Sequence, residues 1–158
     1  MLGLLCFFIC IGSIFGSYFF KRLGNKASFT FATCSYLALI IAFSLPMKRE
    51  ELEAGTDPIF LLHEGFMKAV LIVAISMNGL GVSMLWVSIG DYLSRCAVVE
   101  NKGFFFGMFW SIDQASLIFA YYSVALIYSS EFTTFSFYLV MSSLTVIALV
   151  VFCCLRKP

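Results

Sequence analysis

The chain has 158 residues, of which 61% are hydrophobic and only 12% are charged, and its formal net charge is +1 at pH 7. Soluble domains are about 45–50% apolar and about 25% charged, and a soluble fold of this length has too much surface to hide so many apolar residues. The composition and the mean hydropathy of +0.99 therefore exclude a soluble globular domain, and the small net charge argues against a nucleic-acid-binding surface.

Five apolar stretches are long enough to cross a bilayer as helices, because a helix needs about 20 mostly apolar residues for a hydrocarbon core of about 30 Å. They cover roughly 1–20, 28–46, 67–90, 103–128 and 134–155. The alternating ten-residue strands of a membrane β-barrel are not seen. The sequence predicts an all-α integral membrane protein in which residues 1–158 form a single transmembrane helical domain.

Basic residues gather in alternate connectors between these stretches. The connectors 21–27 and 91–102 and the C-terminal tail hold seven of the ten basic residues: Lys21, Arg22, Lys26, Arg95, Lys102, Arg156 and Lys157. The loop 47–66 has two basic and five acidic residues. Because cytoplasmic loops carry an excess of Lys and Arg, we expect the C-terminus in the cytoplasm and the N-terminus outside or in a lumen. We expect this membrane to be the plasma membrane or an endomembrane.

Glycines occur in close pairs in three of the stretches, and two of these pairs have the four-residue spacing of one helical face. They are Gly12 and Gly16, Gly79 and Gly81, and Gly103 and Gly107. In lipid, helices associate through close packing at small residues rather than by hiding apolar surface. We therefore expect these glycines to make helix contacts within the bundle, with homodimerisation through the same faces as an alternative.

Neither a cofactor nor a bound metal is expected. The six cysteines lie in or beside apolar runs, where they behave as small hydrophobic side chains. His63 is the only histidine and no C-x-x-C pair is present, so a zinc site is not indicated. The chain also lacks a nucleophile elbow and a phosphate-cradling loop, and we expect no enzymatic activity.

One formal charge, Asp113, stands in the middle of the fourth apolar run. A charge there costs several kcal/mol, so an intramembrane carboxyl is a functional candidate by default. On a helix, Asp113, Gln114, Ser116 and Tyr121 fall on one broad side, which we expect to face a central cavity of the bundle. No Lys or Arg lies in the middle of another run, so we expect a carboxyl that is neutral much of the time.

Two tryptophans and one charged pair lie toward the basic ends of their stretches. Trp86 and Trp110 are expected to anchor the helices at the interface or to pack, with a ligand-lining role as the alternative. Asp91 and Arg95 are four residues apart and would pair on one helical face if the helix extends that far.

Two segments resemble motifs of the major facilitator superfamily. Segment 17–26, SYFFKRLGNK, resembles the motif between its second and third helices, and segment 75–84, ISMNGLGVSM, resembles its fourth-helix G-x-G motif. The matching residues are Ser17, Arg22, Gly24 and Lys26 in the first motif and Gly79 and Gly81 in the second. Lys21 stands where an aspartate is usual, and Ile75 where an arginine is usual.

A closer resemblance is to the Unc-ninety-three-like family of that superfamily. It is carried by NGLGVSMLWVSIGDYLSRCA at 78–97 and GFFFGMFWSIDQASLIFAYY at 103–122, with Trp86, Gly90, Asp91, Tyr92, Gly107 and Gln114 in the matching positions. The resemblance implies an incomplete major-facilitator N-terminal six-helix bundle, containing helices two to six. The chain would then be a fragment of a longer protein, without the first helix and the second half of the fold.

For function, the resemblance implies a non-enzymatic regulator or trafficking partner of an ion channel or receptor. A potassium channel is one such partner. The acid and the arginine missing from the two transporter motifs agree with this role. The alternative is a secondary transporter of a small solute, which would bind its substrate near the bilayer midplane between two repeated halves. Asp113 keeps that alternative open.

Overall fold

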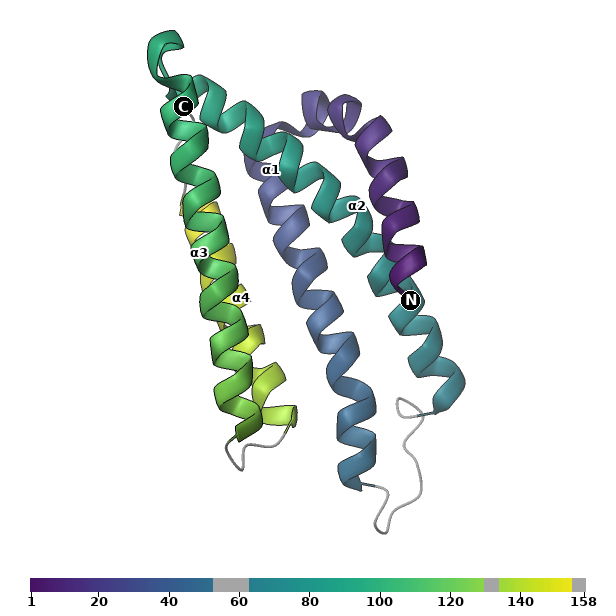
Figure 1. Cartoon of the computed structure of the whole chain (residues 1–158). Coiled ribbons are helices and arrows are strands. Elements are labelled where there is room, and N and C mark those ends of the chain that lie inside the picture. The colour runs from purple at the N-terminus through teal and green to yellow at the C-terminus, as the bar shows by residue number, and fades with distance from the viewer. Residues whose placement is uncertain (53–62, 130–133, 155–158) are drawn as a thin grey trace.

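The computed structural model describes the chain except for residues 53–62, 130–133 and 155–158. The described part contains the helices α1 (Leu2–Leu52), α2 (Glu64–Cys96), α3 (Lys102–Ser129) and α4 (Thr134–Cys154), and the short 3-10 helix η2 (Val99–Asn101) between α2 and α3 (Figure 1). Throughout these residues the chain is helical or irregular, without strands. The predicted all-α class is confirmed.

Four helical segments in this part of the chain are long and apolar enough to cross a membrane. They are Lys21–Pro46, Glu64–Cys96, Val99–Leu126 and Phe135–Cys154, and Leu2–Gly16 is a shorter apolar helix. The chain is therefore a multi-pass membrane protein. Four of the five predicted spans have a counterpart of full length, and the stretch predicted to span at 1–20 corresponds to the shorter helix.

α1 consists of two arms that meet at Gly24. This glycine has φ 76° and ψ 169°, whereas helical geometry continues on both sides of it. That region of backbone conformation is open essentially to glycine alone, because a Cβ atom would clash there. The predicted connector 21–27 is thus reduced to a one-residue break, and we call residues 2–23 the first arm and residues 25–52 the second arm.

The first arm runs parallel to α2. Residue numbers rise together along this contact, since Gly79 lies against Phe8 and Gly16 lies against Val87. A Cβ atom at Gly79 would lie only 2.6 Å from the Cβ of Phe8, a separation that real Cβ atoms do not show. Glycine at this position therefore sets how closely the first arm and α2 approach, as expected for helices associating in lipid.

The second arm crosses the other side of α2 in the opposite direction. Gly81 of α2 faces Ala32 and Ser35, and a Cβ atom at Gly81 would lie 3.3 Å from the Ala32 Cα and collide with the Ser35 hydroxyl. Ser35 and Asn78 are both buried at this contact, and the Ser35 hydroxyl donates to the main-chain oxygen of Ala32 at 2.7 Å. The contact between the arms and α2 is therefore made of small and polar side chains.

α4 packs against the second arm and α3 stands apart. The rings of Phe29 in the second arm and Phe152 in α4 stack with centroids 5.0 Å apart. α3 packs against α2 and η2, and none of the side chains described on it is buried. The second arm, α2, α3 and α4 alternate in direction along the chain (Figure 1).

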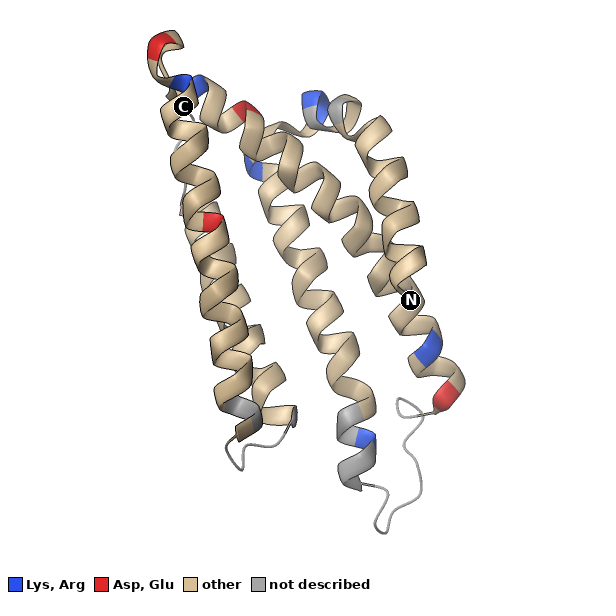
Figure 2. Cartoon of the chain, viewed as in Figure 1, with Lys and Arg blue, Asp and Glu red and all other residues tan. Residues whose placement is uncertain are grey.

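Basic residues lie where the arms of α1 meet, where α2 ends and where α3 begins (Figure 2). We call this the basic end of the bundle. It contains Lys21, Arg22, Lys26, Arg95 and Lys102 among the described residues. The connectors predicted to share one side of the membrane therefore lie together in space.

Replacing Gly24 with alanine should destabilise the protein by about 1–3 kcal/mol, because the alanine Cβ cannot adopt the Gly24 conformation without strain. Gly90→Ala is the matched control. Gly90 has helical geometry and free space around its Cβ position, so the change should be neutral or stabilising by about 0.5–1 kcal/mol. Reversible unfolding in detergent would measure both, and equal effects would contradict the importance of the break.

Candidate functional site

Asp91 joins two helices at the basic end. Its carboxylate accepts a hydrogen bond from the Asn25 side-chain amide of the second arm, with Nδ2 3.3 Å from Oδ2, and it pairs with Arg95 Nε at 2.8 Å. α2 continues to Cys96, so Asp91 and Arg95 share a helical face and the predicted pair is confirmed. The exposed ion pair contributes about 0.3–0.5 kcal/mol, and the bond to Asn25 adds a link between helices.

Aromatic rings next to this carboxylate bring in a third helix. Phe29 is 3% exposed and lies between Tyr92 of α2, with ring centroids 6.2 Å apart, and Phe152 of α4. Beside these rings, Lys26 Nζ donates to the main-chain oxygen of Cys153 at 3.3 Å. Asp91, Tyr92 and Lys26, which the sequence placed in two separate motifs, therefore lie in one cluster at the basic end.

The remaining residues of those motifs do not contribute side chains to this cluster. Arg22 is exposed, and its guanidinium lies over the Tyr18 ring at 5.2 Å from the centroid. Gly24 forms the break in α1, and Gly90 has no atom near its Cβ position. The side chain of Ser17 falls outside the described ones.

α3 is held to α2 by stacked tryptophans. The rings of Trp86 and Trp110 are nearly parallel, at 14°, with centroids 5.4 Å apart, and Phe109 meets Trp86 edge-on at 6.3 Å. Both tryptophans remain partly exposed, 41% for Trp86 and 49% for Trp110. Gly107, one turn away, is exposed and its Cβ position is open, so it makes no close helix contact with the described residues.

The residues predicted to line a central cavity occupy an uncovered side of α3. Asp113 is half-buried, and Gln114, Ser116 and Tyr121 are exposed, Tyr121 at 75%. The Ser116 hydroxyl donates to the main-chain oxygen of Asp113 at 2.7 Å, so it is bound within its own helix. The described helices do not enclose this side, and its place in a central cavity stays a prediction.

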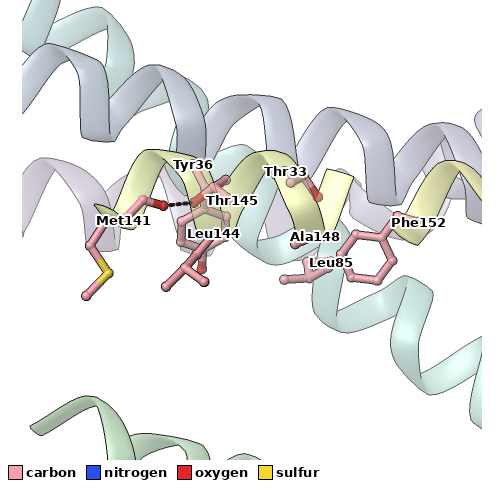
Figure 3. Close-up of a pocket in the computed structure, with 8 residues that line it drawn as sticks. All are labelled: Thr33, Tyr36, Leu85, Met141, Leu144, Thr145, Ala148 and Phe152. Carbon is pink, nitrogen blue, oxygen red and sulfur yellow. Dashed lines mark hydrogen bonds between the residues drawn. The ribbon is translucent and has the colours of Figure 1, made fainter. Parts of the chain in front are cut away.

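A cavity of about 290 Å³ lies between the second arm, α2 and α4 (Figure 3). Its walls include Thr33, Tyr36, Leu85, Thr145 and Phe152. The hydroxyls of Thr33 and Thr145 donate to main-chain oxygens one turn earlier in their own helices, each at 2.8 Å, which leaves the cavity largely apolar. Sequence reasoning did not find this cavity, and the only signal was the presence of threonine and tyrosine in otherwise aliphatic runs.

Several polar side chains that the structure describes make contacts between helices. No three His, Cys, Asp or Glu side chains among them gather where a metal ion could bind. Polar contacts between elements, such as those at Asp91, at Lys26 and between Ser35 and Asn78, join helices to one another. The arrangement thus supports helix association.

A sequence model of the family described as ion channel regulatory protein UNC-93 matches residues 59–158. The chain belongs to the UNC-93 family. The match runs from the approach to α2 through α4, and it contains Gly79, Asp91, Trp86 and Asp113. Comparison with curated proteins and with solved structures gave no match. The UNC-93 family is one of membrane proteins that regulate ion channels, and the predicted resemblance to it is confirmed.

The Trp86–Trp110 stack should contribute about 0.5–1.5 kcal/mol beyond the area that it buries, as close aromatic pairs do. A double-mutant cycle with Trp86→Leu and Trp110→Leu, followed by unfolding in detergent, would measure this coupling. Phe104, 70% exposed on the same helix, provides the control, because Phe104→Leu combined with Trp86→Leu should show additive effects. Additive losses for the tryptophans too would contradict the stack.

Proposed function

We propose that this chain is a non-enzymatic regulator or trafficking partner of an ion channel or receptor, and that it acts through contacts between helices within the bilayer. Membership of the UNC-93 family supports a role in channel regulation. The largely apolar cavity and the structural use of the polar contacts agree with a protein that binds other helices. A potassium channel is the candidate partner that the family resemblance suggests.

The observation that carries this proposal is the exposure of α3. The helix has 28 residues, and the side chains described on it are exposed or only half-buried. A lipid-facing helix would ordinarily be apolar on that face, yet this one presents Asp113 and Gln114. Such a side is stabilised when another helix covers it and supplies hydrogen bonds. A partner protein, or the remainder of a longer chain, would provide that helix.

The arrangement of the chain in the membrane is part of the proposal. The basic end would face the cytoplasm and the loop 47–66 would face outside or a lumen, with the first arm of α1 as a further crossing. The alternating helix directions and the gathered basic residues support this arrangement (Figure 2). The chain would then correspond to helices two to six of a major-facilitator fold, without its first helix and its second half.

Cysteine labelling would test the orientation. On a background without the six native cysteines, a cysteine replacing Thr56 should react with a membrane-impermeant reagent from the outer or lumenal side. A cysteine replacing Lys102 should react only after the membrane is permeabilised from that side. The reverse pattern would overturn the orientation, whereas equal labelling of both positions would show that the segments between them do not separate two compartments.

Secondary transport of a small solute is the second candidate, and Asp113 is the observation that favours it. A carboxyl in the middle of a span can bind and release a proton, which a transporter couples to the movement of solute. The side-chain amide of Gln114 and the hydroxyl of Tyr121, on the same side of α3, would then bind a polar solute. In a regulator the same carboxyl would hold a partner helix.

Asp113→Asn should distinguish the two roles, since it keeps the shape of the side chain and removes its titration. For a regulator, we expect the same solute flux from the unmodified chain and from Asp113→Asn. Asp113→Leu, which removes the hydrogen bonds of the side chain, should reduce co-purification with the partner channel at least several-fold. Glu100→Gln, at an exposed position in η2, is the control. Proton-dependent solute uptake that Asp113→Asn abolishes would establish transport instead.

A further inference from the structure

An apolar groove of about 400 Å³ lies between the two arms of α1 and α2. Its wall on the first arm includes Phe15, Phe19 and Leu23, which are four residues apart and therefore lie on one side of that arm. Phe31 of the second arm and Met84 of α2 close the other sides. The groove is lined by apolar residues throughout, and its volume lies within the range of about 300–1,000 Å³ that is usual for small-molecule sites.

One end of this groove reaches the basic end of the bundle. Leu23, the last residue of its wall, directly follows Lys21 and Arg22, and both of these cations are exposed. The Arg22 guanidinium lies over the ring of Tyr18, which directly precedes Phe19 of the groove wall. The groove therefore ends next to two residues with exposed positive side chains, at the level where the first arm ends.

We propose that the groove binds an anionic glycerophospholipid, with an acyl chain along the groove and the phosphate of the head group at Arg22 and Lys21. Basic pockets between transmembrane helices bind acidic lipid head groups, and the apolar wall matches an acyl chain. A sterol would fill the apolar part and leave both cations without an anion. This inference concerns a different face from α3 and does not rest on the proposed regulatory function.

Gly16 lines the groove at a point where the contact between helices leaves room for a Cβ atom. A Cβ atom at Gly16 would lie 3.7 Å from Val87 Cγ2, which is ordinary van der Waals contact. By contrast, a Cβ atom at Gly12 would collide with Ser83. A larger side chain at position 16 therefore occupies the space of the acyl chain, whereas one at position 12 would separate the first arm from α2.

The test is photo-crosslinking of the full 158-residue chain in phosphatidylcholine vesicles. Phosphatidylserine with a diazirine in its acyl chain is the probe, and phosphatidylcholine with the same acyl chain is the head-group control. Mass spectrometry should place the phosphatidylserine label on the groove segment 15–23 and on Met84, several-fold above the phosphatidylcholine label. Replacing Lys21 or Arg22 with glutamine should reduce the difference by about fivefold for each charge removed.

Matched variants separate the groove from the general lipid environment. Gly16→Leu should remove the label by filling the groove, whereas Gly103→Leu, at an open position on α3, should leave it unchanged. Lys68→Gln removes a cation at the opposite end of α2 and should also have no effect. Equal labelling by the two lipids, or labelling that survives Gly16→Leu in a folded chain, would overturn the proposal. Absence of label from both lipids would overturn it as well, because protein would then cover the groove.

Discussion

Helices in a bilayer gain little by hiding apolar surface from one another, so the contact between α1 and α2 depends on how closely their backbones approach. Gly79 and Gly81 meet this requirement on two sides of α2, one facing the first arm and the other the second. The buried polar groups between these helices, at Ser35 and Asn78, can be accommodated because the helices are so close. The position of the basic end and the apolar groove both follow from this three-way contact.

The same constraint explains why α3 is separate. No atom of another described helix lies within 4 Å of the Cβ positions of its own glycines, Gly103 and Gly107, so no helix packs closely there. The attachment of α3 depends instead on two large rings, Trp86 and Trp110, which hold the helices apart while they stack. A helix attached in this way keeps most of its surface for other contacts, and Asp113 lies on that surface half-buried.

The sequence predicted the helical class and the approximate limits of four long helices, because long apolar stretches mark the segments that lie in lipid. It also predicted the Asp91–Arg95 pair, since spacing within one helix is enough to place both side chains. Contacts between helices could not be predicted in this way. Neither the meeting of Asn25 with Asp91 nor the stacking of Phe29 on Phe152 leaves a local pattern, and the one-residue break at Gly24 was expected as a longer connector.

Membrane insertion of the nascent chain is constrained by the break at Gly24. The two arms of α1 diverge from this single residue, so neither arm can enter the bilayer without bringing the first turn of the other to the same surface. Lys21, Arg22 and Lys26 surround that point, and carrying them through hydrocarbon would cost several kcal/mol for each charge. If both arms cross the bilayer, as proposed above, they would enter it together as a hairpin and leave the charged turn at one membrane surface.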